Sequence, residues 1–227
     1  MSNDIKDYRN SELKSYVFGN ILLIFVSSGL LDKIMLLSEN TNMLTVFNAL
    51  LSSTILSSIM YVFIFLADSV IPSKWKERVI WIFSGLPGER IFSDIKRNCR
   101  DIRFSSKEAS DRYTEIYEAI GKSDKKLRKR VENYNWYLIY KKHESHEQIL
   151  TSQRDYLLCR DLVFMTIFIY IGYIFLQVYR QDVVSWKMIG IFIFEFAISW
   201  ACACTKGRRF VYNVIALDIG QNDKEKR

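Results

Sequence analysis

Glu195 is the one acidic or basic side chain in four long apolar stretches of the chain, residues 15–31, 41–67, 162–179 and 188–205. Each stretch comes close to the ~20 residues that a helix needs to cross the ~30 Å hydrocarbon core of a bilayer. A carboxylate in the middle of such a stretch costs several kcal/mol to bury unless it is protonated, faces water or has a partner. Two interpretations stay open: a pore-facing or gating carboxylate whose protonation is coupled to opening, or a protonated acid hydrogen-bonded between packed helices.

The second apolar stretch adds small polar side chains at helical spacing, which make further pore or gating candidates: Asn48, Ser52, Ser53 and Ser57. Small hydroxyl groups let transmembrane helices approach closely and hydrogen-bond across an interface. The same face could line a narrow water-filled path. The spacing favours close helix packing over a path.

Residues 122–130 concentrate positive charge, with six cations in nine residues: Lys122, Lys125, Lys126, Arg128, Lys129 and Arg130. Such a segment suits anionic lipid head groups, an acidic protein face or nucleic acid. A solvated helix start held near the inner leaflet explains it equally well. We therefore treat it as a candidate partner-binding or lipid-binding segment.

Arg160 and Asp161 stand where a polar helix would enter the third apolar stretch, so they are candidates for coupling cytoplasmic strain to the membrane. Support for catalysis is weak, because no nucleophile motif and no Gly-rich phosphate loop occurs. His143 and His146 are the only histidines, and two ligands at this spacing make a poor metal site. We expect no catalytic residue, no metal and no cofactor.

Lysine and arginine are distributed very unevenly, and this asymmetry predicts the topology. Lys33, Arg180 and Lys187 lie in the two short connections, whereas the other 29 of the 32 Lys and Arg lie before, between or after the two apolar pairs. Because cytoplasmic loops retain Lys and Arg, both termini and residues 72–160 are expected in the cytoplasm.

The predicted fold class is an all-α integral membrane protein, with four transmembrane helices arranged as two hairpins around a helical cytoplasmic insert. The expected segments are a cytoplasmic arm (1–14), a first hairpin (15–71, spans 15–37 and 44–67), a basic helical module (72–155), a second hairpin (156–205, spans 159–179 and 187–205) and a cytoplasmic tail (206–227).

Local patterns predict the helices of the module. Ser105 and Glu108 form a capping box, and an apolar stripe continues that helix to Ile120, where Gly121 stops it. A short helix is expected at 89–100. The absence of Gly and Pro from 122–171 allows one long helix, or two helices broken near residues 143–146.

In this architecture, with apolar hairpins at 15–67 and 162–205 around a basic insert, the chain resembles small membrane subunits of bacterial antiviral defence systems. These are the membrane effectors of certain retrons and the membrane proteins of Kiwa and Hailong. The resemblance implies a partner-controlled, multi-pass protein of the bacterial inner membrane that damages this membrane during phage infection. In the retron case it implies control by a reverse transcriptase with its RNA.

Two functions remain open from the sequence. The first is a homo-oligomeric effector in which the cytoplasmic helices receive a signal and the spans open a leak that depolarises the membrane. The second is a non-conducting anchor whose basic module recruits a cytoplasmic protein or ribonucleoprotein. An integral membrane enzyme or carrier is disfavoured, because the chain is short for the paired repeats of carriers.

Overall fold

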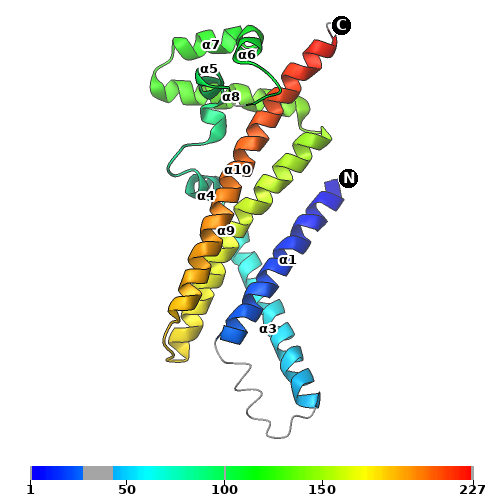
Figure 1. Ribbon diagram of the computed structural model, residues 1–227, viewed down its shortest axis with the longest axis vertical. Coiled ribbons are helices and arrows are strands. Elements are labelled where there is room, and N and C mark those ends of the chain that lie inside the picture. The colour runs from blue at the N-terminus through cyan, green and yellow to red at the C-terminus, as the bar shows by residue number, and fades with distance from the viewer. Residues whose placement is uncertain (1, 28–42, 100, 226–227) are drawn as a thin grey trace. The chain divides into compact units, whose positions relative to one another are not determined.

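The structure is a computed structural model that describes residues 2–27, 43–99 and 101–225 (Figure 1). The helices are α1 (Ser2–Ser27), α3 (Met43–Val70), α4 (Ser73–Ile80), the 3₁₀ turn η1 (Pro87–Glu89), α5 (Ile91–Arg97), α6 (Ser106–Arg112), α7 (Thr114–Gly121), α8 (Lys125–His143), α9 (Glu147–Tyr179) and α10 (Trp186–Glu225). No strand occurs within these described ranges, and the predicted all-helical class is confirmed.

The chain divides into two compact units, which we call the bundle unit and the insert unit. The bundle unit comprises Met1–Lys76 and Leu158–Ala201, and the insert unit comprises Glu77–Leu157 and Cys202–Arg227. Helices α9 and α10 each contribute residues to both units. The residues predicted as a separate tail, 206–227, thus group with most of the predicted module, and α10 remains helical through them as far as Glu225.

Two helices, α9 and α10, are long and apolar enough to cross a bilayer, judged by length and composition. They contain the predicted spans 159–179 and 187–205. Only 39% and 22% of their most apolar windows are buried, which is low for the core helix of a soluble protein. The described residues thus identify two such helices rather than the four that we predicted. Part of span 15–37 lies outside the described residues.

The bundle unit is built on one apolar stripe of α1. Leu13, Val17, Ile21 and Ile24 recur at helical spacing and are all buried. They share a core with Ile64 of α3, with Met165, Ile169 and Tyr173 of α9 and with Met188 and Phe192 of α10. In this unit α9 and α10 form an antiparallel hairpin closed by a short turn, as predicted (Figure 1).

The insert unit follows the local sequence patterns closely, with one exception. The capping box is present, since Ser105 and Glu108 exchange both of its hydrogen bonds. The helix does not continue unbroken to Ile120, because Tyr113 leaves the helical region (φ −112°, ψ 34°) and divides it into α6 and α7. Tyr113 is buried in this position, and its ring packs edge-on against the ring of Phe92, with 5.3 Å between the two ring centroids. Of the two alternatives for 122–171, the break near 143–146 is the correct one.

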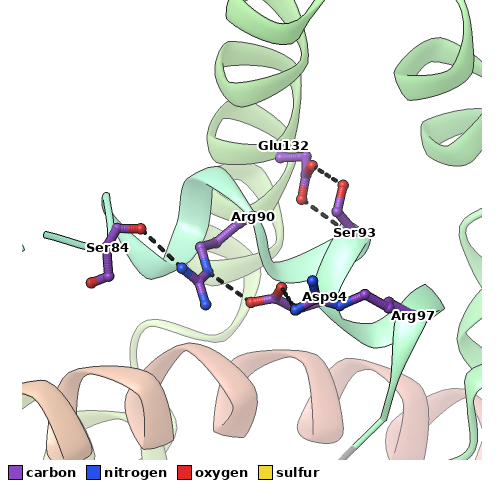
Figure 2. A network of polar contacts seen from close by, with 6 residues as sticks. All are labelled: Ser84, Arg90, Ser93, Asp94, Arg97 and Glu132. Carbon is purple, nitrogen blue, oxygen red and sulfur yellow. Dashed lines mark hydrogen bonds and ion pairs between the residues drawn. The ribbon is translucent and has the colours of Figure 1, made fainter.

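Two buried carboxylates fix the helices of the insert unit to one another. Glu132 of α8 accepts hydrogen bonds from the backbone N–H of Ser93 (3.0 Å) and from its hydroxyl, and it thereby caps the first turn of α5 (Figure 2). Burial raises the pKa of the Glu132 carboxyl, and the bonds from Ser93 oppose this effect. A buried acceptor at a helix N-terminus is favourable because the terminal N–H groups lack partners within the helix.

Asp218 of α10 is the second buried carboxylate of the insert unit. It accepts from the Tyr113 hydroxyl at 2.9 Å, lies 2.9 Å from His143 Nε2 and is 3.3 Å from Arg112 Nε. Burial opposes ionisation of Asp218, but the hydrogen bonds from His143 and Tyr113 and the charge of Arg112 keep its pKa below the usual range. Asp218 therefore ties α10 to α6 and α8 as a carboxylate.

Gly207 allows α10 to approach the other elements of the insert unit closely. A Cβ atom at this position would lie 2.6 Å from Trp81 Cζ2 and 2.9 Å from Tyr156 Cε2. These two rings are themselves joined, because Trp81 Nε1 donates to the Tyr156 hydroxyl at 3.1 Å. The indole and phenol rings have little freedom to move away, so this contact needs a glycine.

We expect Gly207→Ala to destabilise the insert unit by about 1–3 kcal/mol, because the steric cost of overpacking exceeds the ~1 kcal/mol that Ala gains in helix propensity. Gly220→Ala on the same helix is the matched control, since nothing lies within 4 Å of its added Cβ. It should be neutral or stabilising. Thermal unfolding of both variants in detergent, followed by circular dichroism, makes the comparison. Equal melting temperatures would contradict the close packing at Gly207.

Candidate functional site

Glu195 lies in a hydrogen-bonded group that joins three helices of the bundle unit. Its Oε2 is 2.9 Å from the Tyr16 hydroxyl of α1, and this hydroxyl is 2.7 Å from Oγ1 of Thr166 on α9. Thr166 Oγ1 is in turn 2.8 Å from the backbone carbonyl of Leu162. Thr166 is buried, whereas Tyr16 and Glu195 are half-buried. The mid-helix carboxylate therefore has one direct polar partner, Tyr16 of α1, and is connected through it to Thr166 of α9.

The protonation state of Glu195 decides whether this group is complete. Three hydrogen-bond contacts connect Glu195, Tyr16, Thr166 and the carbonyl of Leu162. The two hydroxyl groups supply one hydrogen each, so an ionised Glu195 leaves one contact without a hydrogen. A protonated Glu195 supplies the third and completes the series from the carboxyl group to the carbonyl. Both interpretations of Glu195, packing and proton-coupled gating, are compatible with this geometry.

The surroundings of Tyr16 are polar as well. Asn20 follows one turn later on α1, is 5% exposed and donates from Nδ2 to the Tyr16 carbonyl at 3.2 Å. Its Oδ1 is buried and has no hydrogen-bond donor among the described residues. A buried amide oxygen without a donor is unfavourable in an apolar bundle, which marks this part of α1 as a polar site rather than ordinary core.

A second polar site lies in the same unit, where four ionisable side chains cluster. Lys76 Nζ is 2.5 Å from Asp68 Oδ2 and 3.7 Å from Asp161 Oδ1, and Arg160 Nη2 is 3.0 Å from the same Asp161 oxygen. The side chains of Lys76, Arg160 and Asp161 are at most 7% exposed, and Asp68 is 13% exposed. We call these four residues the ionic cluster.

The ionic cluster joins three helices: Asp68 lies in the last turn of α3, Lys76 belongs to α4, and Arg160 and Asp161 lie near the middle of α9. Along the chain it lies close to two of the three points where the chain passes between the bundle unit and the insert unit. Lys76 is the last residue before the insert unit begins, and Leu158 is the first residue after its larger segment. Arg160 and Asp161, predicted as coupling residues, thus contact each other and Lys76 as part of a buried network.

The pore candidates of the second apolar stretch can be placed only by their helix. Asn48, Ser52, Ser53 and Ser57 belong to α3, but their side chains lie outside the described part of the structure. Whether they face a path or a packed interface remains a prediction.

The basic candidates lie at the start of α8 and before it. Lys122, Lys125, Lys126, Arg128, Lys129 and Arg130 are all exposed. Lys129 Nζ comes within 3.9 Å of Glu89 Oε2, a weak pair at the surface. The segment therefore presents its charge outward, as both partner binding and plain solvation require.

Sequence reasoning did not identify the partners of these candidates. Tyr16 is unremarkable near the start of an apolar stretch, and Lys76 is one of many cations in the basic module 72–155. A usable signal existed for the buried carboxylates of the insert unit, because Glu132 shares helical spacing with Trp136 and Ile139, and Asp218 shares it with Val211 and Ile215. An acid on an apolar stripe indicates a buried polar contact.

The histidines take part in local contacts. His143 meets Asp218, as described above, and the backbone N–H of Gln148 donates to His146 Nδ1 at 3.3 Å. Among the described residues no three His, Cys, Asp or Glu side chains are grouped as a metal ion requires. The polar groups of the bundle unit are therefore the strongest candidates for function.

Comparison with protein families, with curated proteins and with solved structures finds no match to this chain.

Proposed function

We propose that this chain is a multi-pass membrane effector that oligomerises and permeabilises the bacterial inner membrane when its cytoplasmic module is triggered. Four helices cross the bilayer in this proposal, within α1, α3, α9 and α10, and both termini face the cytoplasm. The biological setting that the architectural resemblance favours is antiviral defence by abortive infection. A cytoplasmic regulatory protein or a ribonucleoprotein, such as a reverse transcriptase with its RNA, would restrain or trigger the effector.

Apolar side chains directed away from the bundle core support membrane insertion. On α3, Phe47 is 62% and Phe63 is 64% exposed, and on α10, Phe194 is 66% exposed. Exposed apolar surface on this scale is costly in water and is what lipid contact requires. The first hairpin contributes to this surface as much as the second, which is why the proposal keeps four spans.

The single observation that carries the effector function is the pairing of Glu195 with Tyr16 and Thr166. An anchor needs only apolar helices, and a carboxyl group in mid-span weakens its insertion without contributing to recruitment. In an effector the same group can act as a latch between α10, α1 and α9. The latch is complete when Glu195 is protonated, and ionisation removes one hydrogen bond and places a charge in the bundle.

Packing in the bundle unit supports an oligomer. The centre of the unit is filled by large side chains such as Ile169, Tyr173 and Phe192, none of them more than 2% exposed. A path through a single subunit would need this core to separate. A path between several copies needs only the polar group around Glu195 to become accessible to water, so we propose a homo-oligomeric leak.

The ionic cluster is proposed to link the trigger to the spans. Its cations and carboxylates are buried, so separating a pair is costly, because it leaves an uncompensated charge. It also lies close to two of the three places where the chain enters or leaves the insert unit. A displacement of either segment therefore acts on Lys76 or on Arg160 and Asp161.

A non-conducting anchor is the second candidate function, and the exposed basic segment at 122–130 favours it. Six outward-facing cations offer a surface for an acidic protein or for RNA. The two functions differ in their dependence on Glu195.

The first prediction concerns Glu195 and is tested by membrane potential. Wild-type protein induced alone in bacteria should depolarise the cells, as reported by a voltage-sensitive dye, and Glu195→Leu at matched membrane levels should not. Glu195→Gln should also be inactive, because its amide mimics the protonated acid and keeps the latch closed. Tyr16→Phe should increase the leak, since it removes the hydroxyl group that joins Glu195 to Thr166 and keeps the Glu195 carboxyl, which both Glu195 variants lack. Tyr170→Phe is the matched control, because Tyr170 contacts Phe192 through its ring.

Efflux from liposomes that contain purified protein separates the latch from packing alone. Wild-type efflux should exceed that of Glu195→Gln, whose amide keeps the latch closed, and the difference should appear in liposomes that contain no other protein. If Glu195→Leu depolarises cells as strongly as wild type, the effector proposal is wrong in its central residue. If neither the wild-type protein nor any variant depolarises the cells, with or without phage and the neighbouring genes, the anchor becomes the better proposal.

The second prediction concerns the ionic cluster. Lys76→Met should lower the free energy of unfolding by about 3–5 kcal/mol, because it leaves Asp68 buried without its cation and removes one of the two cations beside Asp161. The double variant Lys76→Met/Asp68→Asn should lose less than the two single variants together, with an interaction of at least ~1 kcal/mol. Lys74→Met is the control, since Lys74 is exposed on the same helix. Unfolding is measured by circular dichroism in detergent, and equal effects at positions 74 and 76 would argue against a buried network.

The third prediction distinguishes the roles of the basic segment. Replacing Lys125, Lys126, Arg128, Lys129 and Arg130 by Gln should leave the leak of reconstituted protein within about twofold of wild type, while weakening capture of the regulatory partner. The anchor predicts loss of all function in this variant, with no leak before or after the change. Efflux and co-purification of the neighbouring gene products are measured side by side. Loss of efflux with normal insertion would show that the segment belongs to the conducting machinery.

A further inference from the structure

A basic cavity lies in the insert unit, and its lining includes neither Glu195 nor any residue of the segment 122–130. It has a volume of about 680 Å³ and is lined by residues of the segment 81–103 and of α10. A cavity of this size falls within the range of small-ligand sites. Five guanidinium groups line it (Arg90, Arg97, Arg103, Arg208 and Arg209) beside two carboxylates (Asp94 and Asp101).

The two carboxylates are already matched by arginines of their own segment. Arg90 donates from Nε to Asp94 Oδ2 at 2.7 Å and from Nη1 to the Ser84 carbonyl at 2.9 Å (Figure 2). Arg103 forms two hydrogen bonds to Asp101, at 2.9 and 2.6 Å. These contacts hold the wall of the cavity and leave a surplus of three positive charges in its lining.

The surplus comes from Arg97, Arg208 and Arg209. Arg97 makes one long contact to Asp94, at 3.4 Å, and its side chain is 80% exposed. Arg208 and Arg209 are exposed on consecutive positions of α10. Guanidinium groups with unused donors bind phosphate oxygens well, because their planar arrangement permits paired hydrogen bonds. The chemistry of the cavity therefore suits a phosphate group.

The wall of the cavity is rigid where it meets the rest of the insert unit. Figure 2 shows the Arg90, Asp94 and Arg97 contacts on one side of α5 and the Ser93–Glu132 contact on the other. Glu132 thus fixes α5 from behind while its opposite side lines the cavity. A fixed wall lowers the ordering cost of binding.

Two features indicate a lipid head group as the source of the phosphate. Arg208 lies three residues beyond the apolar stretch that ends at 205, so along α10 it follows the proposed span by only ~4.5 Å. Between Trp81 and Ser84, which line the cavity, the side chains of Ile82 and Phe83 are 66% and 84% exposed. A basic pocket with an apolar rim at the end of a span matches the head group and the first carbons of an anionic phospholipid.

We infer that this cavity binds the phosphate group of an anionic phospholipid of the inner leaflet, through Arg97, Arg208 and Arg209. The inference rests on the proposal that α10 crosses the membrane, and it is independent of whether the protein conducts ions. It assigns to the insert unit a lipid site that is separate from the basic segment of α8.

Thermal unfolding of the full chain in a neutral detergent tests the site. Adding phosphatidylglycerol should raise the melting temperature of wild type by about 3–5 °C above the effect of phosphatidylcholine, because a ligand that binds the folded state stabilises it. Arg208→Gln/Arg209→Gln should lose at least half of this shift, and Arg97→Gln should lose part of it. Lys107→Gln/Lys142→Gln removes the same charge from exposed positions of the insert unit outside the cavity and should keep the full shift.

Several outcomes would overturn the inference. One is an equal rise in melting temperature with phosphatidylglycerol in the wild type and in the Arg208→Gln/Arg209→Gln variant, provided that both proteins unfold cooperatively without lipid. A second is an equal loss in the Lys107→Gln/Lys142→Gln control, which would indicate general charge attraction. A third is a shift with inorganic pyrophosphate that is larger than that with phosphatidylglycerol, which would assign the cavity to a soluble phosphate compound. Recovery of wild type in the soluble fraction without detergent would instead refute membrane insertion, so the two failures are distinguishable.

Discussion

The cost of placing charge in apolar surroundings is the constraint on which the bundle unit depends. Lys76, Asp68, Arg160 and Asp161 would each be prohibitively expensive to bury alone, and they are tolerated because opposite charges lie within 2.5 to 3.7 Å. The Glu195 carboxyl is stabilised without a cation: it contacts the Tyr16 hydroxyl, which in turn contacts the Thr166 hydroxyl. Polar groups therefore determine how α1, α3, α4, α9 and α10 fit together, because apolar contacts among these helices are tolerant of register.

The sequence predicted what depends on neighbouring residues. The capping box at Ser105 follows from hydrogen bonding within one turn and is confirmed. For residues 122–171 the sequence left one helix or two open, and the structure has the break near residues 143–146. The continuous helix to Ile120 was wrong for the complementary reason. Tyr113 leaves the helix to reach Phe92 and Asp218, and neither partner is visible from the sequence around it.

In the candidate site, too, single residues were identifiable from their sequence neighbours, whereas their partners were not. Glu195 was identifiable because its apolar neighbours make a carboxyl group conspicuous, and Arg160 and Asp161 because they stand at a boundary. Their partners could not be deduced, since Tyr16 lies 179 positions from Glu195 and Lys76 is one of many cations. The number of spans shows the limit of composition as an argument. Hydropathy indicated four apolar stretches, whereas length and hydropathy of the described helices identify α9 and α10.

Glu195 and the ionic cluster together suggest why a signal from the insert unit would reach the spans. Buried ion pairs contribute little net stability, because desolvation offsets most of their attraction, yet breaking one is expensive. A network of this kind resists small displacements and then yields abruptly, which is the behaviour of a switch rather than of a spring. The Glu195 group has the same property through its count of hydrogens: three contacts are satisfied by a protonated acid and only two by a carboxylate. Two thresholds in one bundle would keep a membrane-permeabilising protein closed until both conditions are met.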